Sequence, residues 1–158
     1  HRKDAKNAWV EDALRVSAMI LVVTGLGGSL SEVLKATPAV DYIADFFKNY
    51  GLPSILLPFV IGIIGNMITG STTVGVITAG ALVAPMLGTL GLSPEAAMLS
   101  GASGSVIIKY VNSSYFWVCT SLSGFDAKDG ILGYGGVTLV GGITSFMTVW
   151  AMWAAGFI

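Results

Sequence analysis

Residues 49–94 contain no charged side chain, and this uncharged run of 46 residues constrains the fold more than any other feature of the sequence. A membrane-spanning helix needs about 20 apolar residues to cross a hydrocarbon core about 30 Å thick. The run is therefore too long for one span, and it fits two apolar arms over residues 52–68 and 74–90. A water-exposed surface of this composition would aggregate.

Charged residues are concentrated in the first third of the chain. Twelve lie in residues 1–50 and only five in residues 51–158, and charged residues make up 11% of the whole. A soluble domain has about 25%, so this distribution argues against a soluble enzyme and against a disordered chain. A net charge of −1 argues against nucleic-acid binding, and the single cysteine excludes an internal disulfide framework. The sequence predicts an all-α integral membrane protein, a polytopic helical bundle.

A polar break over residues 69–73, with the sequence Thr-Gly-Ser-Thr-Thr, separates the two apolar arms. The break lacks the charge, the proline and the Asn-Gly pair that an aqueous loop would favour. We therefore predict a re-entrant turn at membrane depth, where hydroxyl groups serve the freed backbone groups.

A second interruption follows a well-marked helix start. Ser93 is the predicted N-cap, Pro94 occupies the first helical position, and Glu95 favours the positive end of the helix dipole. This helix meets the small-residue stretch 100–105 and then the polar stretch 109–114, before apolar residues resume. The pattern is typical of a discontinuous membrane helix.

The remaining segments complete a single membrane domain over residues 1–158. Residues 1–15 are predicted to be a polar lead-in, either a loop or an amphipathic segment, whose basic residues favour the cytoplasmic side. Residues 16–31 suit either a short span or one arm of a re-entrant hairpin, and residues 32–50 an amphipathic interfacial or connecting helix. A polar loop over 124–130 is expected to precede a terminal span.

Polar groups inside a membrane are expensive and by default suggest a function. Broken helices bring backbone N–H groups and the positive ends of half-helices to mid-membrane, where they bind carboxylates. With the nearby hydroxyl and amide groups, the two breaks would suit a small hydroxylated organic anion. In the alternative interpretation, the hydroxyls satisfy local carbonyls and the small residues allow close helix packing. Lys109 is either a counter-charge to a substrate carboxylate or an interfacial lysine that snorkels.

These breaks carry a family resemblance. Residues 69–80, followed by Ala84-Pro85, resemble the gluconate permease (GntP-type) family, and so do residues 101–105 followed by Val111-Asn112 and Phe116-Trp117. Members of that family are proton-coupled symporters for gluconate and related hydroxy acids, built from inverted repeats with hairpins and broken helices. The resemblance implies that the chain is the C-terminal third or so of a longer secondary transporter in the inner membrane.

The resemblance also implies substrate contacts at both breaks. The candidate substrate-binding residues are Gly70, Ser71, Thr72, Thr73, Ser103, Gly104, Ser105, Lys109, Asn112 and Ser113. Tyr110 fills a place where the family often has histidine, Ser113 a place where it often has aspartate, and Lys109 the place of a small polar residue. Because tyrosine and serine do not titrate near neutral pH, we expect a different hydroxy acid or a different coupling.

Two other functions fit the same features. One is an uncoupled organic-anion facilitator or channel, and the other is a non-transporting membrane subunit whose glycines serve only packing. Enzyme motifs are absent, because the only histidine is His1 and no nucleophile–histidine pair can form. We expect the lipid bilayer, a small organic anion and coupling protons as partners, no cofactor and no metal, and we leave open whether the chain forms a homo-oligomer.

Overall fold

The computed structural model describes residues 51–158 continuously, together with residues 9–11, 13–15, 17–18, 21–22, 29, 38, 42, 45–46 and 49–50. Within this described part the regular elements are helices, and no strand occurs there. Residues 9–11 and 13–15 are helical, so of the two alternatives for residues 1–15 the loop is wrong for these positions, because Glu, Ala, Leu and Arg in this stretch are strong helix formers. The segments predicted over 16–31 and 32–50 lie largely outside the described residues.

The uncharged run folds as a helical hairpin. Helix α3 (Leu56–Thr69) ends at Gly70, and α4 (Thr72–Val83) begins two residues later. The chain continues through a short turn η1 (Ala84–Met86) into α5 (Leu87–Leu90). The two predicted arms are confirmed, and Thr72–Leu90 is long and apolar enough to cross a membrane, by length and composition only.

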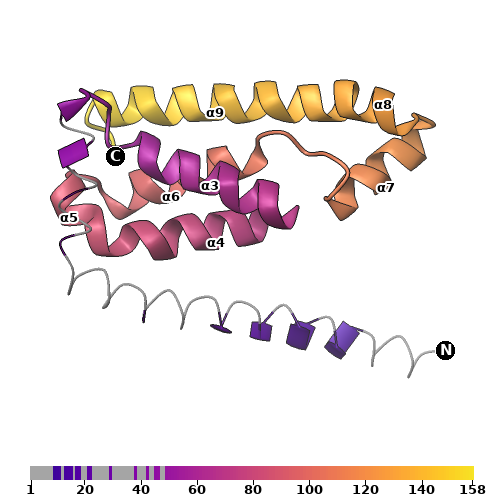
Figure 1. Ribbon diagram of the computed structural model, residues 1–158, viewed down its shortest axis with the longest axis horizontal. Coiled ribbons are helices and arrows are strands. Elements are labelled where there is room, and N and C mark those ends of the chain that lie inside the picture. The colour runs from indigo at the N-terminus through magenta and orange to yellow at the C-terminus, as the bar shows by residue number, and fades with distance from the viewer. Residues whose placement is uncertain are drawn as a thin grey trace.

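The second interruption is a broken helix, as predicted. Helix α6 (Pro94–Val106) begins with the expected cap, in which the Ser93 hydroxyl accepts the Ala96 N–H at 3.0 Å. Residues 107–113 are non-helical, and α7 (Ser114–Ser123) follows them. Figure 1 shows this stretch extending away from the bundle formed by α3, α4 and α6 before it enters α7.

The terminal span begins earlier than predicted. Helices α8 (Ala127–Gly130), η2 (Ile131–Gly135) and α9 (Gly136–Ala154) form one continuous helix that runs along the whole bundle in Figure 1. The predicted polar loop over 124–130 is wrong in its second half, because the Asp126 carboxylate accepts the Asp129 N–H at 2.8 Å and starts the helix. This is the second helix able to cross a membrane by length and composition.

Small residues let the helices approach closely. A Cβ placed on Gly62 or Gly104 would collide with a backbone carbonyl across the α3–α6 contact, and one placed on Gly65 would stand 3.0 Å from the Cα of Gly75 in α4. Close backbone approach of this kind replaces the hydrophobic driving force that helices lack in lipid. Helix α6 also packs on α9.

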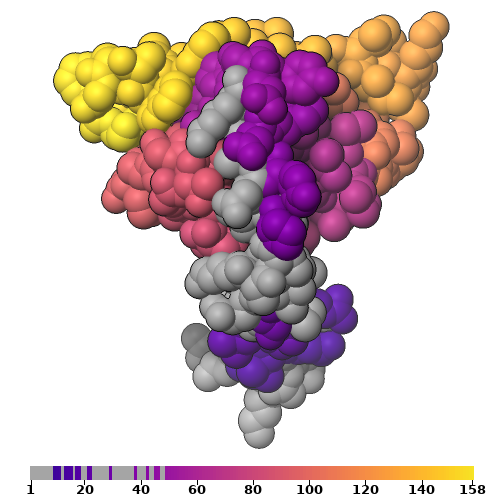
Figure 2. Space-filling view, turned by 60° about the vertical axis from the view of Figure 1, so that its left-hand side comes forward, coloured from indigo at the N-terminus to yellow at the C-terminus, as the bar shows by residue number. Residues whose placement is uncertain are grey.

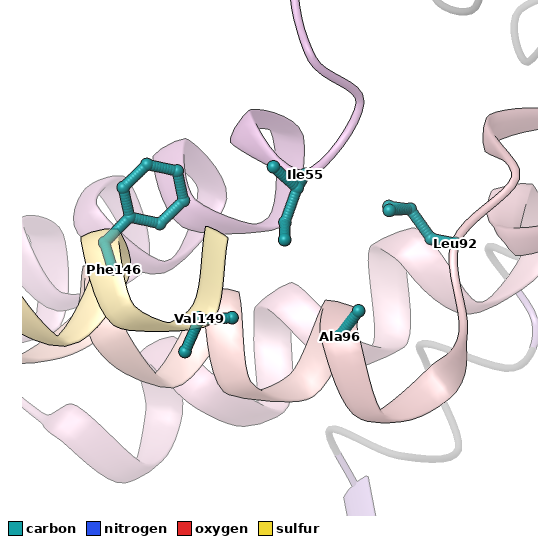
Figure 3. Packing of buried hydrophobic residues seen from close by; sticks show 5 residues of the cluster. All are labelled: Ile55, Leu92, Ala96, Phe146 and Val149. Atoms are coloured by element: carbon teal, nitrogen blue, oxygen red, sulfur yellow. The ribbon is translucent and has the colours of Figure 1, made fainter. Parts of the chain in front are cut away.

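One apolar cluster gathers at the start of α3, the end opposite to Gly70. It consists of Ile55, Leu92, Ala96, Phe146 and Val149 (Figure 3). Phe59 stacks on Phe146 with ring centroids 4.0 Å apart, which joins α3 to α9. In Figure 2 the C-terminal end of the chain (yellow) and the α7 region (orange) lie at opposite edges of the molecule. The cluster thus holds one end of the bundle, and the polar breaks lie toward the other.

Candidate functional site

The two polar breaks meet at Gly70. Its backbone is left-handed, with φ +69°, and a Cβ placed on it would collide with the carbonyl oxygen of Asn112 and stand 3.1 Å from the Cα of Ser113. Glycine is required here on both grounds, because L side chains rarely adopt this conformation and none would fit. The predicted residues Gly70, Asn112 and Ser113 are therefore in direct contact although they come from different breaks.

Two side chains of the second break fasten it to the end of α3. The Tyr110 hydroxyl and the Asn112 side-chain amide each donate to the Met67 carbonyl oxygen, both at 2.7 Å. That carbonyl belongs to the last turn of α3, where the helix leaves carbonyl groups without partners of its own. The Trp117 indole N–H closes the break on its other side by donating to the Val111 carbonyl at 2.8 Å.

Two helix N-termini face this contact. Ser71 caps α4, its hydroxyl accepting the Val74 N–H at 3.3 Å, and Ser113 is the N-cap of α7. The first N–H groups of each helix have no partner inside the helix, and each N-terminus carries about half a positive charge. Since Gly70 touches both Asn112 and Ser113, these two positive ends lie beside each other. Thr72 and Thr73 form the first turn of α4 at this point.

Lys109 lies inside the bundle, and its ammonium reaches α3 at Asn66, one helical turn before Gly70. Its side chain is only 6% exposed, and its ammonium group donates to the side-chain oxygen of Asn66 in α3. Among the residues that the structure describes, no carboxylate pairs with it. The alternative of an interfacial, snorkelling lysine is therefore wrong for this structure, because burial and the bond to Asn66 keep the ammonium away from the surface.

The backbone around Lys109 is held on both sides. The Asn66 amide donates to the Ile107 carbonyl at 3.0 Å, and the Lys109 N–H donates to the Thr138 hydroxyl of α9 at 3.0 Å. Between these anchors Ile108 has a φ of +51°, which is unusual for a β-branched residue and costs about 1–3 kcal/mol. Such a conformation persists only where the surrounding structure dictates it, and here the two hydrogen bonds do so.

Three predicted residues of α6 do not join the breaks. The hydroxyls of Ser103 and Ser105 donate to carbonyls of their own helix at 2.8 and 2.9 Å. Ser103 lines a groove between α6 and α9, Gly104 packs against the Phe59 carbonyl of α3, and Ser105 lies against Gly75 of α4. These contacts match the helix-packing interpretation of the small residues.

Sequence reasoning missed Asn66 and Thr138, the two partners of Lys109. Asn66 is 1% exposed and is the one side-chain amide within the apolar arm over residues 52–68. An isolated amide in such an arm is expensive in a membrane, which was the signal that could have marked it. Thr138 carried no comparable signal, because a threonine in a membrane helix commonly bonds to its own backbone.

The assembled site is suited to an anion. It combines two helix N-termini, a buried ammonium and several hydroxyl and amide groups around the contact of the two breaks. No cluster of three histidine, cysteine, aspartate or glutamate side chains that could hold a metal exists in the described residues. The available chemistry is the binding of a carboxylate and of neighbouring hydroxyl groups.

Comparison with known proteins assigns the chain to a family. Residues 1–155 match the family described as GntP family permease. The chain is similar to the high-affinity gluconate transporter of Escherichia coli (34% identity, 73% of this chain, 26% of the relative) and the gluconate permease of Bacillus licheniformis (34%, 74%, 26%). It is also similar to the inner membrane permease YgbN of Escherichia coli (29%, 90%, 32%). The chain spans about a quarter to a third of the length of these relatives, and no solved structure matches it.

Proposed function

The chain belongs to the GntP permease family, and on that premise we propose that it is the C-terminal part of a secondary active transporter for gluconate or a related small hydroxy-carboxylate. The family is one of membrane permeases rather than enzymes. The relatives named as gluconate transporters support the substrate class. A multi-pass location in the inner membrane is part of the same proposal and is supported by the relative named as an inner membrane permease.

The contact between the two breaks is the observation that carries this proposal. The contact at Gly70 joins a hairpin tip to a broken helix, and the N-termini of α4 and α7 both begin there. In membrane transporters, half-helix N-termini that meet near mid-membrane point at anionic groups of the substrate. Lys109 adds a positive charge at Asn66, one helical turn before Gly70. We place the substrate carboxylate at this point, with Ser71, Thr72 and Asn112 binding the sugar-acid hydroxyls.

Alternating access would follow from movement of one bundle against another around this site. The described hairpin and broken helix would form one of the inverted repeats, and the rest of the transporter would supply the other. Residues 1–15 would then lie on the cytoplasmic side. Ser103, Gly104 and Ser105 would contribute through the packing of α6 rather than by touching substrate.

Proton symport is the coupling we propose, on the strength of the family resemblance. The second candidate is an uncoupled facilitator, and one observation favours it. Among the described residues that form the site, neither a carboxylate nor a histidine is present to carry a proton, since Tyr110 and Ser113 occupy those places. The two candidates differ in whether substrate accumulates above its equilibrium concentration.

Uptake of labelled gluconate into proteoliposomes tests both candidates. The full-length transporter is assayed with and without an inward proton gradient, with unlabelled hydroxy acids as competitors. Accumulation above equilibrium that requires the gradient supports symport, whereas saturable equilibration that ignores the gradient supports the facilitator. Absence of uptake for gluconate and every competitor would contradict the substrate assignment and favour a subunit that serves only packing.

A further inference from the structure

Asn66 occupies a position that the proposed function does not use. Its side chain is 1% exposed and lies in the last turns of α3, four residues before the Gly70 contact. Its oxygen accepts the Lys109 ammonium and its nitrogen donates to the Ile107 carbonyl at 3.0 Å. Each polar atom of the amide therefore bonds to the segment that follows α6, the nitrogen to Ile107 and the oxygen to Lys109.

The hydrogen bond from Lys109 to Asn66 leaves the positive charge of the ammonium uncancelled. A primary amide is neutral, so it satisfies one N–H of the ammonium without cancelling the positive charge. Within the described residues no carboxylate lies in ion-pair contact with Lys109. A buried charge without an opposite charge is costly in a membrane, and an anion that binds beside it removes that cost.

We propose that Asn66 is a specificity-determining residue that holds the Lys109 ammonium at the contact of the two breaks as a single, uncompensated positive charge, which selects substrates carrying one carboxylate. The inference rests on the proposed transport function. A monoanion would make the site neutral. A neutral analogue would leave the buried cation unpaired, and a dianion would leave one excess negative charge in surroundings of low dielectric constant.

An isosteric charge change tests the proposal. Asn66→Asp keeps the size and one acceptor oxygen of the side chain but supplies Lys109 with a permanent partner. The assay compares uptake of three probes of equal carbon length: gluconamide (neutral), gluconate (one carboxylate) and glucarate (two carboxylates). The full-length wild type is expected to prefer gluconate over both others. In Asn66→Asp the gluconate-to-gluconamide ratio of kcat/KM should fall by about 10- to 100-fold, the loss expected for a hydrogen-bonded charge.

Exchanging the residues at positions 66 and 109 tests whether Asn66 positions the charge or only supports the fold. The double variant Asn66→Lys with Lys109→Asn moves the ammonium to α3 and the amide to the second break, so the charge stays at the same contact. We expect it to recover at least part of the preference for gluconate. Lys109→Gln, which removes the charge but retains an N–H donor, should lose the preference as Asn66→Asp does. It serves as the test if Asn66→Asp does not reach the membrane.

The outcomes distinguish this inference from the proposed function. A wild type that transports none of the probes overturns the transport assignment and the inference together. A wild type that transports gluconate, combined with an unchanged probe ratio in Asn66→Asp, overturns the inference alone. An unchanged ratio in Lys109→Gln overturns the inference together with the placement of the substrate carboxylate beside Lys109, and leaves the transport assignment standing. Equal loss of all three probes in Asn66→Asp without recovery in the exchanged pair also overturns it, because that is the behaviour of a residue with a structural role only.

Discussion

Replacing Gly70 by alanine should separate the two polar breaks and stop transport. The methyl group would collide with the Asn112 carbonyl oxygen and stand 2.7 Å from its carbonyl carbon, well inside the ordinary contact range of 3.4–4 Å. Both atoms belong to the backbone carbonyl of Asn112, which cannot rotate aside as a side chain can. The hairpin tip must therefore move away from the broken helix. That movement breaks the hydrogen bonds from Tyr110 and Asn112 to the Met67 carbonyl.

The magnitude of the Gly70→Ala effect has two parts. Alanine in a left-handed conformation costs about 1–2 kcal/mol, and the two lost hydrogen bonds add about 0.5–1.5 kcal/mol each. The free energy of unfolding should therefore fall by about 2–5 kcal/mol, and uptake by more than about tenfold because the site is pulled apart. Gly124→Ala is the matched control. Gly124 has the same φ of +69° but nothing within 4 Å of its Cβ position, so only the conformational part applies.

The assay combines thermal unfolding in detergent with proteoliposome uptake for both alanine variants. The expected order of stability is wild type, then Gly124→Ala, then Gly70→Ala, and only Gly70→Ala should lose uptake. If Gly70→Ala transports like the wild type and unfolds no earlier than Gly124→Ala, the contact between the breaks does not support the site.

Three further predictions follow from named contacts. Gly104→Ala should lower the melting temperature by several degrees, because its Cβ would collide with a carbonyl of α3. Gly141→Ala is the control and should not lower it, because nothing lies within 4 Å of that Cβ position. Equal melting temperatures of the two variants would contradict close packing of α6 on α3. Ser71→Ala and Ser93→Ala each remove one N-cap bond worth about 1 kcal/mol, but only Ser71→Ala should also raise the KM for uptake. Thr138→Val leaves the Lys109 N–H without its acceptor and should destabilise the fold by about 1–3 kcal/mol, measured by denaturant unfolding.

Much of the helical layout could be predicted from local sequence. The uncharged run over residues 49–94 and its polar interruption predicted a hairpin, and α3 and α4 form it with Gly70 between them. The Ser93 cap could be predicted because it depends on residues only three positions apart, the Ser93 hydroxyl and the Ala96 N–H. The start of the terminal helix was predicted too late in the chain. Asp126 caps this helix as Ser93 caps α6, but the charged first turn that follows Asp126 resembles a loop in sequence.

The candidate site was predicted less completely. Both breaks were expected to contribute to the site, and the structure brings Gly70 of the first into contact with Asn112 and Ser113 of the second, whereas Ser103 lies in a groove between α6 and α9. The polar character of a stretch shows that a helix is interrupted, but it does not show which way each side chain points. Where helices approach through glycine, a rotation of one residue moves a side chain from the site to a packing face.

The sequence by itself determined the membrane setting, the positions of the breaks and the helix caps. These depend on hydrophobicity summed over a segment and on hydrogen bonds between residues three or four apart. Only the tertiary structure decided that the breaks touch and that Lys109 is buried against Asn66. Those contacts join residues 41 to 45 positions apart, and they arise from the close packing of α3 against α6, which no local pattern specifies.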